Sequence, residues 1–407
     1  MCQNKKTLHF FTNEYPYGIK SESFIVAELV YLSRAFNKII IYPSYKPEGI
    51  RETPENVIVS DLLIHTETAR LKKIQLLFEY LLTSLSILLS EVKSKGLFKV
   101  LKNRNLLLDN ISTQLLKLKR FKTNNQFNTK DLFYDYWFEN STLFLSIAKK
   151  KNYITKFISR GHGFDIYDER WINIGVPFRD FKITYLNHLY IISEYGYNYV
   201  KQRTPSQFQN KLSISKLGVH QSPKNHRQKE SNTINIVSCS NILKFKQVHL
   251  IPELLVNLKG NIHWTHFGDG PKKVKLESKL KTLPNNISVD LQGQKDNTEI
   301  YNFYTNNHVD LFLSLSTTEG IPVSMMEAQS YNIPIAAYNV GGIGEILKDT
   351  KTGIFLDQNS SFDDQAKQLE EILRFNFSEK VILEFFRNNF DASFNYPKFI
   401  REIESII

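Results

Sequence analysis

The chain is poor in cysteine and lacks a long uninterrupted apolar run. Its 407 residues include only Cys2 and Cys239, which is too few for a disulfide framework or a cysteine-rich zinc site. The most apolar stretch, residues 74–89, is interrupted by Glu79 and is shorter than the roughly 20 residues that span a bilayer. The opening residues hold no long apolar region. We therefore expect a protein of a reducing cytosol, with neither a secretory signal nor an integral membrane anchor.

Acidic residues are outnumbered in this sequence. The 52 Lys and Arg exceed the 41 Asp and Glu, which gives a formal net charge of +11. A basic excess of this size predicts an anionic partner: nucleic acid, an acidic membrane surface or a phosphorylated small molecule. With 42% hydrophobic and 23% charged residues the composition is that of a folded protein, and the length predicts two or three domains.

Apolar periodicity predicts a parallel sheet in the first half of the chain. A strand at 8–12 precedes a loop with turn residues at 13–20, a helical pattern at 24–35 and a fully apolar strand at 38–42. This order implies right-handed crossovers in an α/β fold. Two further strands are expected around 153–159 and 188–193.

Residues 68–122 form an unusual Leu-rich and Lys-rich segment. It contains no proline and only Gly96 as an interruption, so we expect it to be helical. Residues 92–122 hold nine Lys or Arg against one acid, Asp109. Two interpretations stay open, a solvated face or an interfacial helix on anionic lipid, with nucleic acid less favoured. The apolar residues between the cations are Leu97, Phe98, Leu101, Leu106, Leu107, Leu108, Leu115, Leu116, Leu118 and Phe121.

A polar stretch without periodicity divides the chain in two. Residues 222–232 are predicted to be a linker. A second series of strands and helices starts at 233, with a helix near 248–258 and strands near 262–267, 309–316 and 333–338. The chain is therefore expected to consist of two α/β halves.

The most informative stretch is residues 314–345, because it places acids and free amides at the end of a buried strand. A loop at 317–321 leads into a helix near 323–331, whose first turn Pro322 suits. The amides of Gly320, Ile321, Val323 and Ser324 are then free to bind an anion at the carboxyl edge of the sheet. Glu319 in the loop and Glu327 one turn inside the helix can reach opposite parts of one polyhydroxylated ligand.

These residues resemble the group 1 (family 4) retaining glycosyltransferases of GT-B fold. Glu319 and Glu327 match the family's E-x7-E motif within EGIPVSMMEA, and NVGGIGEIL follows as it does in that family. In the similar loop SCSNILKFK, Lys246 falls on the family's lysine position and Asn241 stands where the family has arginine. The loop holding Gly18 and the SRGHGFD loop around His162 also resemble family loops.

The resemblance implies two Rossmann-like domains that face a central cleft, with a C-terminal helix that crosses back to the first domain. The implied limits are an acceptor domain at 1–221, including the basic helical segment 68–122, and a donor domain at 233–385 after the linker. Residues 386–407 are expected to be the helices that pack back on the N-terminal domain.

The resemblance also implies the chemistry. Glu327 would hydrogen-bond ribose hydroxyls, Glu319 would hold the transferred sugar, and Lys246 with the helix amides would stabilise the leaving diphosphate. We expect no metal, since Asp165 and Asp168 have one residue too many between them for a D-x-D motif. No cofactor is expected besides the nucleotide-diphosphate sugar donor. The implied catalytic residues are His162 and Glu319, and the implied donor-binding residues are Gly18, Asn241, Lys246, Glu319, Gly320, Ile321, Pro322, Val323 and Glu327.

The expected function is therefore sugar transfer to a glycan acceptor, lipid-linked or soluble, in bacterial surface polysaccharide synthesis. The expected location is the cytoplasm, with peripheral attachment to the inner face of the membrane through 92–122 as an option, and no nucleic acid partner. Two alternatives remain. One is a nucleotide-sugar epimerase of GT-B fold, and the other is a non-catalytic basic adaptor for lipid or nucleic acid.

Overall fold

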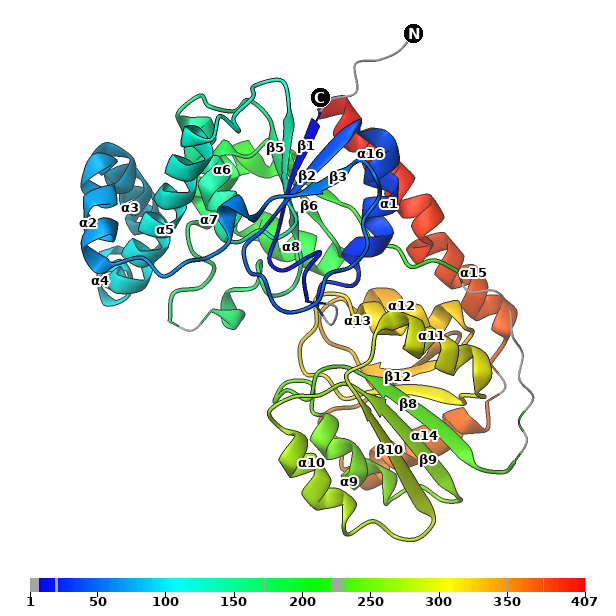
Figure 1. Cartoon of the computed structure of the whole chain (residues 1–407). Helices are drawn as coiled ribbons and strands as arrows, with labels where there is room; N and C mark the ends of the chain where they lie inside the picture. The colour runs from blue at the N-terminus through cyan, green and yellow to red at the C-terminus, as the bar shows by residue number, and fades with distance from the viewer. Residues whose placement is uncertain are drawn as a thin grey trace. The chain divides into compact units, whose positions relative to one another are not determined.

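The computed structural model describes residues 7–18, 21–171, 173–221, 229, 231–348, 350–375 and 377–406 (Figure 1). The predicted linker lies mostly outside them, at 222–228 and 230. The chain divides into two compact units: unit 1 is Met1–Lys216 with Tyr396–Ile407, and unit 2 is Leu217–Asn395. The expected limits were 221 and 386, so residues 217–221 and 386–395 lie with unit 2.

Unit 1 is built on a seven-stranded parallel sheet, as the strand–helix alternation predicts. The strand order is β3-β2-β1-β4-β5-β6-β7. The strands are β1 (Thr7–Thr12), β2 (Lys38–Pro43), β3 (Val57–Val59), β4 (Leu132–Asp135), β5 (Phe157–Gly161), β6 (His188–Ile191) and β7 (Leu212–Ile214).

Helices cover both faces of this sheet. On one face, α1 (Ile25–Ala35) lies beside α16 (Ala392–Ile406), and their apolar side chains share a core with strands β1, β2 and β4 (Figure 1). On the other face the core is formed mainly by α5 (Arg104–Thr123), α6 (Asn140–Lys150) and α7 (Arg179–Tyr185). One further helix, α8 (Glu194–Gln202), precedes the last strand.

The predicted helical segment forms four helices, which we call the insert. They are α2 (Arg70–Glu79), α3 (Leu81–Lys95), α4 (Leu97–Lys102) and α5, and they lie together at the outer edge of unit 1 (Figure 1). The apolar stretch 74–89 is not one helix, because the chain breaks at Tyr80. Within the described residues no single helix has the length and apolarity of a membrane span; α2 and α3 reach both only together, across a 91° bend.

The second half of the basic stretch buries its apolar side in unit 1, whereas Lys119 and Lys122 are exposed. Six of its apolar residues lie in the core of unit 1, because α5 packs against α6: Leu107, Ile111, Leu115, Leu116, Leu118 and Phe121. Lys117 is buried too, and its Nζ donates to Ser44 Oγ at 3.2 Å and Ser141 Oγ at 3.4 Å. Of the cations after Leu107 only Lys117 is buried, so the interpretation of 92–122 as a solvated basic face is wrong for Lys117 and for the apolar side of α5, but not for Lys119 and Lys122.

Unit 2 has a six-stranded parallel sheet of order β10-β9-β8-β11-β12-β13. The predicted strands and the helix after Pro322 are confirmed. Its strands are β8 (Ile234–Cys239), β9 (Ile262–Phe267), β10 (Ile287–Gly293), β11 (Leu311–Ser314), β12 (Ile335–Tyr338) and β13 (Gly353–Leu356). Its helices are α9 (Ile251–Leu255), α10 (Lys273–Leu280), α11 (Asn297–Asn306), α12 (Val323–Ser330), α13 (Ile343–Ile346), α14 (Phe362–Leu373) and α15 (Glu379–Phe390).

Candidate functional site

The strand order of unit 2 places two loops at one switch point. Strands β8 and β11 are neighbours, and the chain leaves them toward opposite edges of the sheet. Ligands of doubly wound sheets bind beyond the carboxyl ends of such strands. The loop after β8 and the loop after β11 are tied there, because the Thr317 amide donates to the Phe245 carbonyl at 2.8 Å.

The predicted pair of Lys246 and Glu319 meets across these two loops. Lys246 Nζ lies 2.5 Å from Glu319 Oε1. Glu319 is 7% exposed and the lysine side chain is little exposed, so water screens the pair weakly. The contact brings a cation and a carboxylate, 73 residues apart in sequence, to the edge where a ligand is expected.

Two glycines determine the position of the loop that carries Glu319. The Gly342 amide donates to the Gly320 carbonyl at 2.9 Å. A Cβ atom on Gly341 would lie 1.9 Å from the Glu319 carbonyl oxygen, and Gly341 also has φ +56°. The glycine pair is therefore required by close backbone contact, and it fixes the loop from which Glu319 projects.

Helix α12 follows this loop directly and begins as the sequence predicts. Pro322 is its N-cap, and its first amides have no carbonyl partner within the helix. Ile321 and Pro322 are buried, whereas Gly320 and Val323 are half-buried. The free amides and the positive end of the helix dipole favour an anion at this position.

Glu327 is buried one turn further along and is held by two residues of α11. Asn297 Nδ2 donates to Glu327 Oε1 at 2.6 Å, and Tyr301 OH donates to the same oxygen at 2.8 Å. Among the described residues no bond to Oε2 is present, which leaves that oxygen for a ligand hydroxyl. Burial raises the pKa of the Glu327 carboxyl to about 7, and the two donated bonds oppose this rise.

Sequence reasoning missed Asn297 and Tyr301. A signal was present: Asp296 and Glu299 form a capping box directly after strand β10. This predicts a helix that starts near the carboxyl edge of the sheet, where the Glu327 side chain also lies. The pairing of Asn297 with Glu327, 30 positions later, is not readable from local sequence.

Two further residues lie close to this site. Asn241 is exposed in the loop after β8, and its role at the family's arginine position stays a prediction. Cys239 ends β8 as a free thiol. Burial, together with the charge of the Glu327 carboxylate, raises the pKa of the Cys239 thiol to about 12, so the thiol stays protonated at neutral pH.

Unit 1 has its own switch point, between β1 and β4. Glu22 shapes the loop after β1, since its carboxylate accepts the amides of Asn13, Glu14 and Tyr15 at 3.1, 2.7 and 2.6 Å. Gly18 lies in this loop with φ +64°, where a Cβ atom would lie 2.7 Å from Pro47 Cγ. Packing alone accounts for this glycine, and its predicted donor contact remains untested.

His162 follows β5 and is buried in an aromatic pocket. Its ring lies 4.4 Å from that of Trp137 and 4.9 Å from that of Tyr136. Its amide donates to Asp165 Oδ1 at 2.6 Å, and its Nδ1 lies 3.5 Å from Asp165 Oδ2, whereas Nε2 has no hydrogen-bond partner in the described part of the chain. A buried ring nitrogen without a hydrogen bond is costly, which favours a ligand contact for Nε2 of His162.

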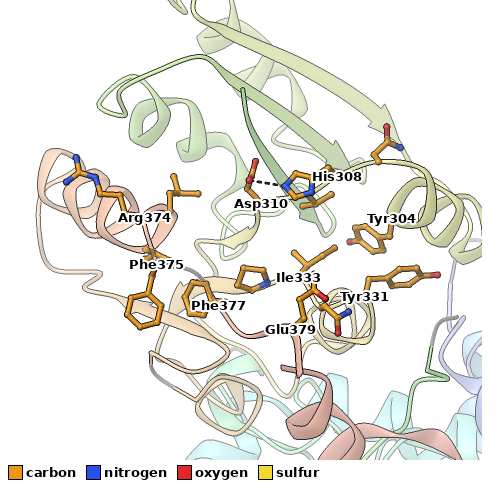
Figure 2. Close-up of a pocket in the computed structure, with 15 residues that line it drawn as sticks. Tyr304, His308, Asp310, Tyr331, Ile333, Arg374, Phe375, Phe377 and Glu379 are labelled. Atoms are coloured by element: carbon orange, nitrogen blue, oxygen red, sulfur yellow. Dashed lines mark hydrogen bonds and ion pairs between the residues drawn. The ribbon is translucent and has the colours of Figure 1, made fainter. Parts of the chain in front are cut away.

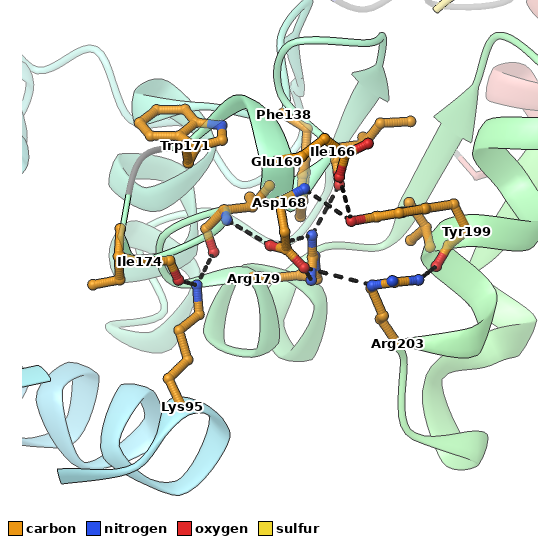
Figure 3. Close-up of polar contacts among 12 residues, drawn as sticks. Lys95, Phe138, Ile166, Asp168, Glu169, Trp171, Ile174, Arg179, Tyr199 and Arg203 are labelled. Carbon is orange, nitrogen blue, oxygen red and sulfur yellow. Dashed lines mark hydrogen bonds and ion pairs between the residues drawn. The ribbon is translucent and has the colours of Figure 1, made fainter. Parts of the chain in front are cut away.

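A cavity of about 790 Å³ opens in unit 1 between the insert and the segment that follows His162. In Figure 3, Lys95 projects from the end of α3 toward Ile174, whose carbonyl accepts from Nζ at 2.8 Å. Arg179 binds both oxygens of Asp168, at 3.0 and 2.9 Å. The lining includes two aromatic side chains and several polar ones, which are Trp171, Tyr199, Lys99, Glu169, Asn173, Asp180 and Arg203.

A second cavity, of about 420 Å³, lies in unit 2 at the ends of the strands opposite to those beside Glu319. Figure 2 shows His308 and Asp310 facing one another there, with His308 Nε2 3.1 Å from Asp310 Oδ1. Asp310 precedes β11 and Pro334 precedes β12, so this cavity lies at the amino ends of the strands. It is therefore distinct from the site of Lys246, Glu319 and Glu327.

No group of three or more His, Cys, Asp or Glu side chains among the described residues is arranged to hold a metal ion. Asp165 and Asp168 serve other contacts. Asp165 Oδ2 accepts the Phe138 amide at 2.8 Å, and Asp168 pairs with Arg179.

Comparison with known proteins agrees with the resemblance over unit 2. Residues 221–382 match the family described as glycosyl transferases group 1. The putative colanic acid biosynthesis glycosyltransferase WcaL of Salmonella typhimurium is 24% identical over 208 residues, 48% of this chain and 51% of that protein. The O-antigen biosynthesis glycosyltransferase WbnH of Escherichia coli is 30% identical over 142 residues, 33% of this chain and 39% of that protein. The chain spans about half the length, or less, of these curated relatives.

Solved structures extend the likeness to the whole chain. Anabaena HepE, solved in complex with UDP and glucose, has a TM-score of 0.67 at 10% identity, covering 98% of this chain and 100% of that one. At such low identity the likeness bears on the fold alone. The predicted GT-B fold is confirmed.

Proposed function

Since residues 221–382 belong to the group 1 glycosyl transferases and the chain has the GT-B fold, we propose that it is a retaining glycosyltransferase. It moves a sugar from a nucleotide-diphosphate sugar to a glycan acceptor in bacterial surface polysaccharide synthesis. The names of WcaL and WbnH support this setting, and the UDP and glucose bound to HepE support the donor class. The observation that carries the proposal is the Lys246–Glu319 pair at the switch point beside Glu327.

In this proposal the residues of the unit 2 site have distinct roles. Oε2 of Glu327 accepts from the two ribose hydroxyls, while Asn297 and Tyr301 hold the other oxygen. Glu319 accepts from a hydroxyl of the transferred sugar and keeps Lys246 in place. Lys246 and the first amides of α12 then stabilise the charge of the leaving diphosphate.

The reaction breaks the bond between the anomeric carbon and the diphosphate oxygen. The acceptor hydroxyl oxygen forms a new bond to that carbon on the same face, and its proton passes to the leaving diphosphate. This route uses no protein nucleophile and no metal, so positioning supplies much of the rate.

We propose that the acceptor is a lipid-linked glycan bound by unit 1, and that the enzyme works in the cytoplasm at the inner face of the membrane. The cavity beside the insert supports an acceptor site there, since Trp171 and Tyr199 offer aromatic faces and Glu169, Asn173 and Asp180 offer polar groups for sugar hydroxyls. Nε2 of His162, which has no hydrogen-bond partner among the described residues, supports a role for this residue near the transferred sugar.

A panel of nucleoside diphosphates and nucleotide sugars tests the donor assignment. A true donor raises the melting temperature of the chain by mass action. It should also yield a glycoside of unchanged anomeric configuration, assigned by NMR, when an acceptor is added. If no member of the panel binds, the proposal is wrong. Conversion of the donor to an isomeric nucleotide sugar without acceptor would instead identify an epimerase.

A further inference from the structure

The insert exposes as many large apolar side chains as all the rest of the described chain, in a much shorter stretch of sequence. Among the described residues, eleven of the 22 exposed large apolar side chains lie between Leu71 and Leu106. Leu82 and Phe98 are each 83% exposed. Such a concentration of exposed apolar side chains is typical of an interaction site. The eleven are Leu71, Ile74, Phe78, Leu81, Leu82, Leu85, Leu89, Leu97, Phe98, Leu101 and Leu106.

These residues follow the helical repeat, so each helix presents an apolar stripe. On α2 the stripe has spacings of three and four, through Leu71, Ile74 and Phe78, and on α4 it runs from Leu97 to Leu101. Each stripe lies on the side of its helix that faces away from the core of unit 1. The apolar surface is therefore a property of three consecutive helices.

Helix α3 exposes apolar side chains and buries mostly polar ones, which is the reverse of an ordinary surface helix. Its exposed stripe consists of leucines, at 81, 82, 85 and 89. Its buried side chains are mostly polar: Thr83, Ser84 and Glu91 accompany Ile87. The Glu91 carboxylate accepts the Phe178 amide at 2.9 Å and lies 3.3 Å from Lys95 Nζ, so the polar face is used inside the protein. The exposed leucines of such a helix favour contact with an apolar environment instead of water.

The charged residues of the insert indicate what kind of partner its apolar surface binds. Six exposed cations accompany the leucines, and Glu79 is the one exposed acid among residues 70–106. Glu79 is neutralised by Lys119, at 2.8 Å. A second copy of the chain would bring the same cations together, so self-association through this face is disfavoured. The cations are Arg70, Lys72, Lys93, Lys99, Lys102 and Arg104.

We propose that the insert surface, defined as residues 70–106, docks on an anionic lipid bilayer. Its helices lie in the interface, with leucines at the acyl boundary and cations at the headgroups. The surface is thus formed by α2, α3, α4 and the first turn of α5, and it shares only residues 92–106 with the 92–122 stretch that the sequence suggested. It rests on the proposed function for its purpose, which is access to a lipid-linked acceptor.

The acceptor cavity adjoins this surface. Lys95 and Lys99 line the cavity, and Lys99 lies between Phe98 and Leu101 of the apolar stripe on α4. A glycan carried on lipid can therefore reach the cavity from the bilayer through a short polar path. The phosphate that links glycan and lipid meets the exposed Lys99 on the way, whereas Lys95 is bound to the Ile174 and Val176 carbonyls and shapes the cavity wall.

Vesicle co-sedimentation of the full chain tests the proposal. Vesicles of phosphatidylcholine alone are compared with vesicles that contain about one-third phosphatidylglycerol. We expect strong binding only to the anionic vesicles. Replacing three cations together, in a K99Q/K102Q/R104Q variant, should weaken binding by about 100-fold, since each adjacent cation contributes about 1 kcal/mol.

A second variant tests the apolar contribution. L82S/L85S/L89S should reduce vesicle binding at least as much, because it removes the leucines of α3. The matched control V256S/V274S/F375S removes exposed apolar side chains of unit 2 and should leave vesicle binding unchanged. Thermal unfolding checks that each variant is folded. Equal binding of wild type and both insert variants would overturn the proposal.

The oligomeric state and the donor affinity separate the remaining outcomes. A wild-type dimer in analytical ultracentrifugation that L82S/L85S/L89S converts to monomer would replace the bilayer by a second copy. Failure of vesicle binding with intact nucleotide-sugar affinity rejects only the docking surface. Vesicle binding without nucleotide-sugar affinity rejects only the proposed function.

Discussion

Glu327→Gln is expected to lower donor affinity and to raise stability at alkaline pH. The substitution keeps the shape of the side chain and the acceptor oxygen that faces Asn297 and Tyr301, and it removes the charge. Burial raises the pKa of the Glu327 carboxyl from 4.5 to about 7, so the folded protein holds a proton there that the unfolded chain releases.

The size of the change in the free energy of unfolding follows from this pKa difference. One pKa unit corresponds to about 1.4 kcal/mol, so the charged carboxylate destabilises the folded state by about 3 kcal/mol relative to the protonated one. The folded state binds more protons between pH 4.5 and 7, so the free energy of unfolding falls over this window as pH rises. The glutamine variant lacks this decline, so it should exceed wild type by about 1 kcal/mol at about pH 5 and by about 3 kcal/mol at about pH 8.

The effect on binding has the opposite sign. A hydrogen bond from a ribose hydroxyl to a charged acceptor contributes roughly 1 kcal/mol more than one to a neutral acceptor. With two hydroxyls the loss is about 2 kcal/mol, which corresponds to a dissociation constant about 30-fold weaker. The wild-type affinity should itself weaken as pH falls below about 7, and the affinity of the variant should not.

Urea unfolding at about pH 5 and about pH 8 measures the first effect, and titration calorimetry with the nucleoside diphosphate that wild type binds measures the second. Glu371→Gln, an exposed position on α14, serves as the control and should change neither quantity. Equal nucleotide affinity of wild type and E327Q would refute the ribose contact. An unchanged pH dependence of stability would refute the assigned cause of the raised pKa.

Three further substitutions test the site and its support. Lys246→Met should slow sugar transfer by about 100-fold, because it removes one group that stabilises the leaving diphosphate, whereas K244M in the same loop should not; product formation measures both. Gly341→Ala should abolish donor binding in a thermal-shift assay, because its Cβ clashes with the Glu319 carbonyl, whereas G293A shares a positive φ, meets open space and should bind normally. Glu28→Ala should lower the free energy of unfolding by about 3–5 kcal/mol in urea, because it strands the fully buried Arg160 guanidinium; a loss under about 1 kcal/mol would contradict this.

The sequence alone determined the fold class and half of the candidate site. Continuous apolar runs alternate with helical periodicity, and this order admits few topologies other than parallel sheets. Pro322 and the run of apolar residues after it fix the start of α12, so the local sequence suffices to place Glu319 and Glu327 at the carboxyl edge of the sheet. These features depend on near neighbours in the chain, which is why they could be read from it.

Partners distant in sequence could not be found in this way. Asn297 and Tyr301 meet Glu327 because α11 and α12 lie side by side above the sheet, which depends on strand order. The close contact of Gly341 with the Glu319 loop likewise needed the fold, since sequence indicated only a turn.

The insert shows most clearly which features could be read from the sequence and which depended on tertiary structure. The leucine- and lysine-rich composition without proline predicted helices, but it says nothing about which side of each helix meets the core. Helix α3 buries Thr83, Ser84 and Glu91 and exposes leucines, while α5 buries Lys117 with its leucines. Tertiary packing made this choice, because α5 fills the space beside α6 and the polar groups of α3 find partners on the segment before α7. The sequence alone determined that the insert is helical, apolar and basic, and only the tertiary structure decided which of its residues reach the surface.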